Sequence, residues 1–251
     1  MNSDIELQID KTVNWLREQV KKAGAKGLIV GISGGIDSAL VSFLIKKAFP
    51  DDSLGVILPC GSYSKDRKDA LSVIRACKIN FIEIDLTEEH NSIMYKVKET
   101  LGINDTDFNK ESLKMSDANH RARLRMSTLY SIANIFNYLV VGTDNAAELF
   151  IGYFTKYGDG GVDILPIANL TKRQVYQWSM VLGIPEDIIS KAPSAGLWEG
   201  QTDEEEIGVS YDKVDDFLEG KEIPAKDTEL IIKLHNKTEH KRNTPTTCPK
   251  F

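Results

Sequence analysis

The segment GLIVGISGGIDSALVSFLIKKA, residues 27–48, decides the fold. It begins with an apolar, β-branched run, passes through a turn of glycines and serines, and continues as an apolar stretch of helical length. This order predicts a strand that ends at Ile32, a tight turn, and a helix over Asp37–Ala48. The question is what the turn SGGIDS, residues 33–38, does between the two elements.

Strand-like and helix-like segments alternate through most of the chain. Three further β-rich runs are predicted as strands: Leu54–Leu58, Phe81–Leu86 and Tyr138–Thr143. Helical composition or spacing predicts helices over Ser64–Cys77, Ala122–Phe136, Thr171–Leu182 and Pro224–Lys237. A polar, helix-leaning region extends to about Asn119. This alternation predicts βαβ crossovers and a doubly wound parallel sheet with helices on both faces. We therefore expect a single α/β domain over residues 1–251, with a helical C-terminal portion.

Composition and charge argue against two classes of partner and indicate the compartment. The formal net charge of −6 argues against nonspecific binding to nucleic acid or to acidic membranes. No apolar run is long enough to span a bilayer, and residues 1–24 form a charged amphipathic pattern rather than a signal peptide. The three cysteines form no CxxC pair, which is typical of a reducing compartment. We expect a cytoplasmic protein with no nucleic-acid or membrane partner.

The turn at residues 33–38 has the chemistry of a phosphate site. In open parallel sheets, ligands bind beyond the carboxyl ends of the strands, where this turn lies. Gly34 and Gly35 allow close backbone approach, and the N-terminus of the following helix presents free N–H groups. Ser33 and Ser38 add hydroxyl groups. Asp37 would repel a phosphate unless a divalent cation such as Mg²⁺ lay between them.

Other interpretations of the same residues remain open at this point. The P-loop pattern GxxxxGK[ST] fails because no lysine precedes Ser38, and the GxGxxG pattern fails on glycine spacing. Residues 31–35 match the GxSxG nucleophile elbow, which would make Ser33 the nucleophile of an α/β-hydrolase. Against it, no earlier strand exists to supply the usual oxyanion loop, and none of the four histidines is distinguished as a base. A tight capped turn without any ligand is the remaining interpretation.

A second group of polar residues follows the last predicted strand. Thr143 or Asp144 could simply cap the next helix, which runs through Glu148, and for Asp144 this interpretation is favoured. If the two strand ends are neighbours, Glu148 can face the same cation as Asp37. The alternative is that Glu148 is a solvated surface residue.

The sequence resembles a known family over residues 27–242. SGGIDS resembles the SGGxDS signature of ATP pyrophosphatases, which adenylate a substrate oxygen and release pyrophosphate. The run GTDNAAELFIGYFTKYGDGGVDILPIANLTKRQ, residues 142–174, is similar to one found in ammonia-dependent NAD synthetases. Three more segments resemble the same family: NHRARLRM (119–126), PSAGLWEGQTDEEEIGVSYDKVDDFLEG (193–220) and TEHKR (238–242).

The resemblance implies a Rossmann-like fold of the adenine nucleotide alpha-hydrolase type. It also implies the activity: amidation of deamido-NAD (nicotinate adenine dinucleotide) by ammonia and ATP through an adenylated intermediate, giving NAD, AMP and pyrophosphate. Mg²⁺ is the implied metal and a homodimer the implied assembly, and the chain is too short for the glutaminase domain of the glutamine-dependent branch. Another SGGxDS-type adenylating amidotransferase is the alternative within the superfamily.

The resemblance further implies roles for individual residues. The ATP-binding residues would be Gly31, Ile32, Ser33, Gly34, Gly35, Ile36, Asp37, Ser38, Thr143, Lys172 and Ser194, the last of which is a threonine in some members. Asp37 and Glu148 would hold the metal. The deamido-NAD-binding residues would be Arg123, Lys156, Asp163, His240 and Lys241. Asp37, Lys172 and Asp163 would be catalytic, and Asp163 is expected to receive or guide a proton of ammonia.

Overall fold

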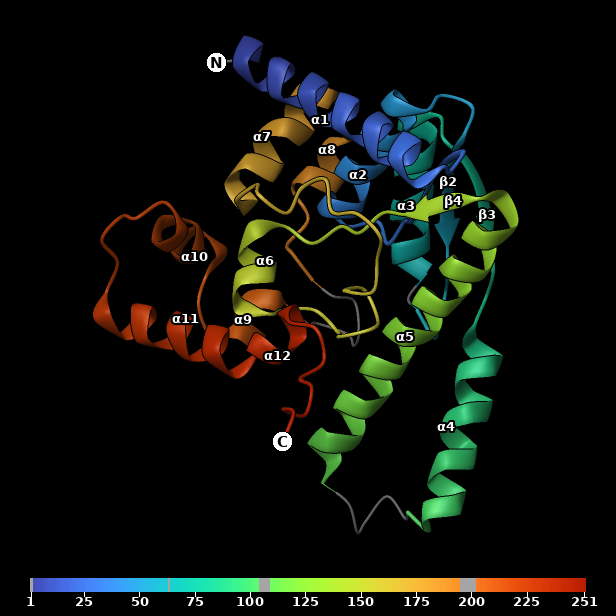
Figure 1. Ribbon diagram of the computed structural model, residues 1–251, viewed down its shortest axis with the longest axis vertical. Coiled ribbons are helices and arrows are strands. Elements are labelled where there is room, and N and C mark those ends of the chain that lie inside the picture. The colour runs from blue at the N-terminus through green and yellow to red at the C-terminus, as the bar shows by residue number, and fades with distance from the viewer. Residues whose placement is uncertain (1, 63, 104–108, 195–201) are drawn as a thin grey trace.

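The protein is described by a computed structural model over residues 2–62, 64–103, 109–194 and 202–251. Its centre is a four-stranded sheet, all parallel, in the order β3-β2-β1-β4 (Figure 1). The strands are β1 (Gly27–Gly31), β2 (Ser53–Ile57), β3 (Asn80–Glu83) and β4 (Tyr138–Val140). β1 is central and buried on both faces, which explains its continuous apolar sequence.

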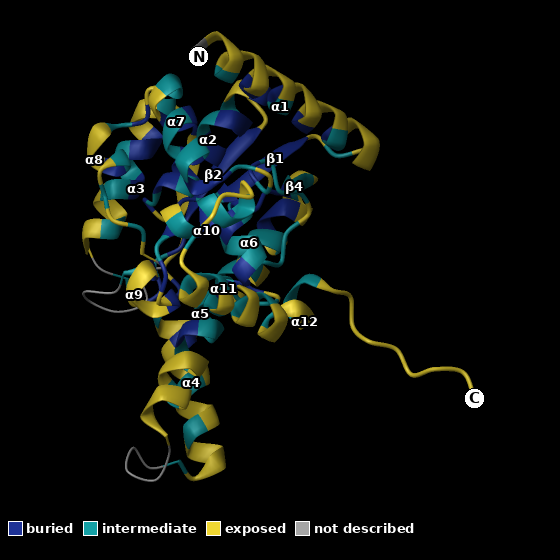
Figure 2. Cartoon of the chain, turned by 90° about the vertical axis from the view of Figure 1, so that its left-hand side faces the viewer, coloured by how far each residue is buried: buried dark blue, intermediate teal, exposed yellow. Residues whose placement is uncertain are grey.

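Helices cover both faces of the sheet. On one face pack α1 (Asn2–Ala23), α2 (Ile36–Ala48), α3 (Ser64–Cys77), α7 (Lys172–Leu182) and α8 (Glu186–Ile189). Leu28 and Val30 of β1 point into this core, whereas Ile29 points to the opposite face, against α5 (Lys110–Phe136). The interior of the sheet and α2 are the most deeply buried parts of the chain (Figure 2). The predicted doubly wound α/β fold is confirmed.

The order of the strands reverses its direction at β1. The chain runs β1-α2-β2-α3-β3 in one direction across the sheet, then returns through α4 (Thr87–Leu101) and α5 to place β4 on the other side of β1. β1 and β4 are therefore the two neighbouring strands between which the direction of the strand order reverses. This is the topological switch point at which open α/β sheets bind ligands.

The C-terminal portion is helical, as predicted. It contains α6 (Ala146–Ile151), α9 (Asp203–Ile207), α10 (Tyr211–Leu218), α11 (Ala225–Lys237) and α12 (Glu239–Arg242). Buried apolar side chains of α6, α9, α10 and α11 form a core cluster of their own beside the sheet (Figure 1). α6 follows β4 directly, so this cluster is attached at the switch point.

Several element boundaries differ from the sequence prediction. β3 stops at Glu83 rather than Leu86, and α4 begins at Thr87, whose backbone N–H and hydroxyl donate to Asp85. β4 stops at Val140, after which only an isolated bridge joins Val141 to Ile164. In the predicted polar loop 192–206, residues 195–201 lie outside the described part, and α9 already begins at Asp203.

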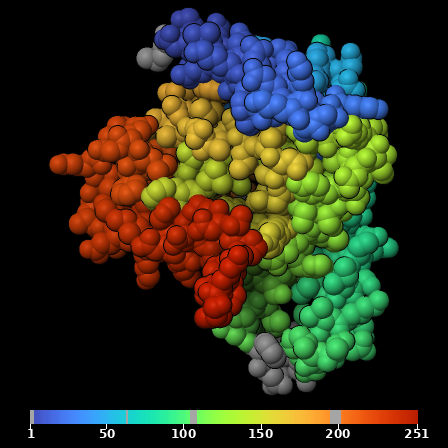
Figure 3. Space-filling model, viewed as in Figure 1, coloured from blue at the N-terminus to red at the C-terminus, as the bar shows by residue number. Residues whose placement is uncertain are grey.

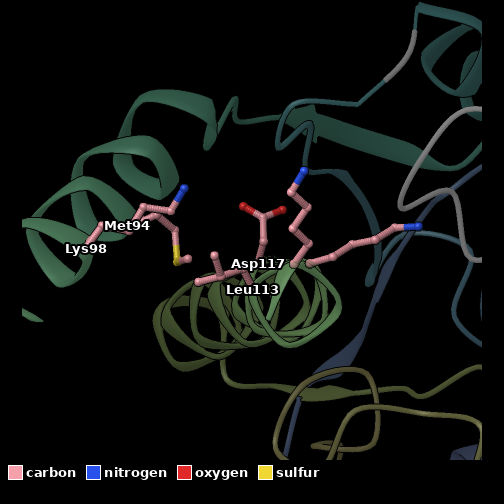
Figure 4. Close-up of a pocket in the computed structure, with 6 residues that line it drawn as sticks. Met94, Lys98, Leu113 and Asp117 are labelled. Atoms are coloured by element: carbon pink, nitrogen blue, oxygen red, sulfur yellow. The ribbon is translucent and has the colours of Figure 1, made fainter. Parts of the chain in front are cut away.

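α4 and the first half of α5 extend away from the rest of the molecule as an arm (Figures 1 and 2). A groove of about 350 Å³ between them is lined by Met94, Lys98, Lys110, Leu113, Lys114 and Asp117 (Figure 4). None of the predicted site residues lines this groove. Within the described ranges, no helix combines the length and apolar character that crossing a membrane requires.

The packing of the turn after β1 against α3 can be tested by substituting Gly34. Gly34 has φ +82°, and a Cβ at this position would lie 2.7 Å from Asp69 Cβ and 2.9 Å from the backbone of Asp66 and Ala70. Gly24 also has a positive φ, +65°, but its Cβ would meet nothing within 4 Å. We expect Gly24→Ala to cost about 1–2 kcal/mol of unfolding free energy, from the left-handed backbone alone. Gly34→Ala should cost clearly more, as measured by urea denaturation. Equal losses would show that the turn does not pack tightly against α3.

Candidate active site

The turn between β1 and α2 is held in shape by its own serines. The Oγ atoms of Ser33 and Ser38 lie 3.0 Å apart, and the N–H of Gly35 donates to Ser33 Oγ at 3.2 Å. Ser38 Oγ in turn donates to the carbonyl of Gly35 at 3.0 Å. The N-cap Gly35 provides no side-chain hydrogen bond to α2, so the first N–H groups of this helix remain available to an anion.

Two carboxylates meet beside this turn. Asp37 lies in the first turn of α2, and Glu148 lies in the first turn of α6. Asn145 joins them: its amide donates to Asp37 Oδ1 at 3.0 Å, and it forms a capping box with Glu148. The expected cap at Thr143 or Asp144 is wrong, because the helix begins later and Asn145 is its N-cap. The expected approach of Glu148 to Asp37 is confirmed.

Lys172 lies between the two carboxylates. Its Nζ is 2.6 Å from Asp37 Oδ2 and 3.1 Å from Glu148 Oε1, and the residue is only 2% exposed. Lys172 is the first residue of α7, which Thr171 caps through a capping box with Gln174. Asp215 also accepts hydrogen bonds from the backbone N–H groups of Lys172 and Arg173. Three residues that the sequence predicted for one site therefore come together from three helices.

Burial and neighbouring charges shift the pKa values of this group. Burial raises the pKa of Glu148 to about 7, with repulsion from Asp37 acting in the same direction and Lys172 opposing it. Burial lowers the pKa of Lys172, but attraction to Asp37 and Glu148 outweighs it, and its pKa rises above its usual value. Burial also raises the pKa of Asp144, whose Oδ2 has no hydrogen-bond partner among the described residues.

The pair Asp37 and Glu148 fits a divalent cation. A cation, the ammonium of Lys172, already lies within hydrogen-bond distance of both carboxylates. No set of three His, Cys, Asp or Glu side chains in the described residues could hold a metal without further ligands. A pair of carboxylates is typical of Mg²⁺ sites in which substrate phosphates supply further ligands, and the turn at residues 33–38 adjoins this pair.

Several residues predicted to bind the second substrate are joined by hydrogen bonds around the loop that follows α6. Arg123 Nε donates to the carbonyl of Lys156 at 3.2 Å, and Lys156 Nζ donates to the carbonyl of His240. Lys241 Nζ donates to the carbonyls of Gly152 and Phe154 at 2.8 and 2.7 Å. The C-terminal segment, red in Figure 3, thus lies against the loop that follows α6 and close to α5. These contacts bring four predicted residues together.

Three other predicted residues have different surroundings. Both carboxylate oxygens of Asp163 are engaged, one by the hydroxyl of Tyr130 at 2.9 Å and the other by the N–H of Val140 at 2.8 Å. Thr143 lies in the connection between β4 and α6. Ser194 is exposed at the end of a described range, immediately before residues 195–201. Their predicted roles stay predictions.

The structure adds residues that sequence reasoning missed. Asn145 had a local signal, since Asn followed three residues later by Glu is a capping-box pattern. Asp215 and Tyr211 had none: the first caps α7 from α10, and the hydroxyl of the second lies 3.3 Å from Glu148 Oε1. Only the folded chain brings these residues to the site.

Comparison with known proteins shows the family of the chain. The sequence pattern of the family described as NAD synthase matches residues 8–245. The chain belongs to the NAD synthase family. A relative from Alkaliphilus oremlandii, named NH(3)-dependent NAD(+) synthetase, is 61% identical, and the aligned part covers 98% of each chain.

Solved structures of the family superpose well on the chain. The NMN synthetase from Francisella tularensis has a TM-score of 0.90 at 40% identity, covering 98% of this chain and 99% of that one. The NH3-dependent NAD synthetase from Campylobacter jejuni has a TM-score of 0.76 at 27% identity, with the same coverage. The predicted family and the predicted enzyme class, a ligase, are therefore confirmed, and the hydrolase interpretation of Ser33 is not supported.

The raised pKa of Glu148 predicts how stability depends on pH. An unfolded glutamate ionises near pH 4.5, so the contribution of Glu148 is fully present below that pH and is lost as the pH rises through about 7. In EDTA, the unfolding free energy of the wild type should fall more steeply from about pH 5 to about pH 8 than that of Glu148→Gln, which cannot titrate. Urea denaturation across this range measures both slopes. Parallel slopes would contradict a raised pKa.

Proposed function

We propose that the protein is an ammonia-dependent NAD synthetase, which amidates deamido-NAD with ATP and ammonia and releases NAD, AMP and pyrophosphate. One observation carries this proposal: Asp37, Glu148 and Lys172 meet at the topological switch point beside a serine-braced phosphate turn. The name of the relative at 61% identity supports the choice of substrates. We expect the enzyme to work in the cytoplasm.

The first step joins two anions, so it needs charge neutralisation and alignment. A carboxylate oxygen of the nicotinate attacks the α-phosphorus of ATP, the bond to the β-phosphate oxygen breaks, and pyrophosphate leaves with the electron pair. The free N–H groups at the start of α2 and the ammonium of Lys172 would stabilise the phosphate charge. Asp37 and Glu148 would hold a divalent cation, in our proposal Mg²⁺, which supplies further neutralisation of that charge when it is bound.

The second step replaces AMP by nitrogen. Ammonia attacks the carbonyl carbon of the acyl adenylate, AMP leaves, and the nitrogen loses one proton to form the amide. Asp163 is our candidate for guiding this proton. Arg123, Lys156, His240 and Lys241 would bind deamido-NAD; their mutual contacts support a common role.

A second product is suggested by one specific observation. The solved structure with a TM-score of 0.90 is an NMN synthetase. NMN carries the same nicotinamide as NAD but lacks the adenylate half, so the chemistry at Asp37, Glu148 and Lys172 would be unchanged. Nicotinate mononucleotide is therefore the second candidate substrate, and only the region that receives the adenylate half distinguishes the two.

A direct assay tests both substrates. With ATP, ammonium and Mg²⁺, we expect deamido-NAD to give equal amounts of NAD, AMP and pyrophosphate, with a higher kcat/KM than nicotinate mononucleotide. Asp37→Asn keeps the size of the side chain but removes its charge, and should lower kcat at least about 100-fold. Chromatographic separation of the nucleotides is the measurement. Formation of ADP would reject the mechanism, and preference for the mononucleotide would establish the second candidate.

The surface of the molecule supports a homodimer. β3 is an edge strand whose four residues are all exposed, and it carries the apolar Phe81 and Ile82. On α4, the exposed Ile93, Val97 and Leu101 recur every four residues and form one stripe along the arm. An edge strand and an apolar stripe of this kind fit an interface with a second copy of the chain, related by a two-fold axis.

A charge placed on this stripe tests the dimer. Val97→Glu should convert the dimer into a monomer in multi-angle light scattering, because a carboxylate would be buried at the interface. Lys96→Glu introduces the same side chain one residue away, outside the stripe, and should leave the dimer intact. A wild type that is monomeric at all concentrations would reject the proposed assembly.

A further inference from the structure

Tyr211 contacts two of the three charged residues of the proposed site, Glu148 and Lys172. Its side chain is buried, with the residue 4% exposed, at the start of α10. The hydroxyl oxygen lies 3.3 Å from Glu148 Oε1 and 3.2 Å from Asp203 Oδ2. The centre of the ring lies 4.8 Å from the Nζ of Lys172, within the range of a cation–π interaction.

Both carboxylate oxygens of Glu148 accept hydrogen bonds from neighbouring residues. Its Oε2 accepts the N–H of Asn145 at 3.2 Å, while its Oε1 accepts from Lys172 Nζ at 3.1 Å and from Tyr211. Of these donors, Lys172 is also the group that has to interact with phosphate. When its ammonium turns toward a nucleotide, Tyr211 is the donor that remains on Oε1 and keeps the carboxylate oriented.

We propose that Tyr211 is a positioning residue that orients Glu148 for the divalent cation and keeps the ammonium of Lys172 beside the two carboxylates. The proposal rests on the proposed function, since it assigns Glu148 and Lys172 to metal and phosphate. The hydroxyl has one proton and donates to one carboxylate at a time, either Glu148 or Asp203. A protein group that orients a metal ligand in this way typically contributes 10–100-fold, roughly, to metal affinity.

The same hydroxyl links the site to a neighbouring segment. Asp203, the first residue of α9, also accepts a hydrogen bond from Tyr153 at 3.1 Å, and Tyr153 donates to Glu206 at 2.9 Å. Tyr153 therefore reaches the catalytic carboxylates only through Asp203, whereas Tyr211 touches Glu148 itself. This difference makes Tyr153 the matched control, because both tyrosines hydrogen-bond to the same aspartate.

The test compares Tyr211→Phe with Tyr153→Phe, each of which removes one oxygen atom and keeps the ring. Mn²⁺ serves as the probe, titrated by electron paramagnetic resonance with and without α,β-methylene-ATP, which cannot release pyrophosphate. We expect Tyr211→Phe to weaken Mn²⁺ binding at least about 10-fold and Tyr153→Phe less than about 2-fold. The Mg²⁺ concentration for half-maximal activity should rise in Tyr211→Phe more than the KM for the nicotinate substrate.

Two results would overturn the proposal: wild-type Mn²⁺ affinity in Tyr211→Phe, or an equal loss in Tyr153→Phe, which would indicate general loosening around Asp203. Thermal unfolding in EDTA compares the folds of the two variants. Should Tyr211→Phe unfold at the assay temperature, Asp203→Asn takes its place. It leaves the contact between Tyr211 and Glu148, so Mn²⁺ affinity near that of the wild type is expected and a 10-fold loss, roughly, rejects the proposal. Mn²⁺ affinity does not depend on turnover, so a failed positioning role is distinguishable from a failed assignment of the reaction.

Discussion

The structure of the site depends on one buried interaction, the ammonium of Lys172 between the carboxylates of Asp37 and Glu148. Desolvating charges is costly, and a buried ion pair that loses a partner leaves an uncompensated charge. Here one cation faces two anions, and burial, with repulsion from Asp37 acting in the same direction, raises the pKa of Glu148. The cluster is thus prepared for additional positive charge, which is the state that a metal-dependent reaction of ATP requires.

The sheet topology makes this interaction possible. Asp37 follows β1 through the phosphate turn, and Glu148 follows β4 through the cap at Asn145. Because β4 pairs with β1 on the side opposite β2, the two strand ends are adjacent although the residues are far apart in the chain. Lys172 reaches the same place from α7, which packs on α2 within the larger core. Burial positions these helices, but it also removes their charged side chains from water. The attraction between Lys172 and the two carboxylates has to offset this desolvation cost.

Sequence reasoning went furthest where the signal was local. The apolar run of β1, the glycines of the turn and the alternation of elements predicted the fold and one edge of the site. The rule that ligands bind beyond strand ends pointed to Glu148 as a neighbour of Asp37. Lys172 was reached only through the family resemblance, since nothing near it in the sequence distinguishes it from a surface lysine.

The remaining contacts could not be found from the sequence, for a physical reason. Asn145 and Asp37 are 108 residues apart, and Lys172 and Asp37 are 135 apart, so their meeting depends on how whole helices pack. Periodicity predicts which face of a helix is buried, but not which polar group at its end meets which partner. Tyr211 is the sharpest case: it belongs to an apolar core cluster, and its position in the chain gives no sign that its hydroxyl reaches a catalytic carboxylate.

The charge balance of the site limits what Lys172 can do. When both carboxylates are ionised, Asp37, Glu148 and Lys172 carry one net negative charge, and the triphosphate of ATP would add several more. Attraction between the turn and the nucleotide therefore cannot come from Lys172 alone; it needs the N–H groups of α2 and a cation on the carboxylates. A cation held by Asp37 and Glu148 would neutralise these carboxylates in place of the ammonium of Lys172, which would then be able to face phosphate. In our proposal Lys172 would therefore both neutralise the two carboxylates and contribute to the reaction, and this exchange would require neighbours that keep Glu148 in place.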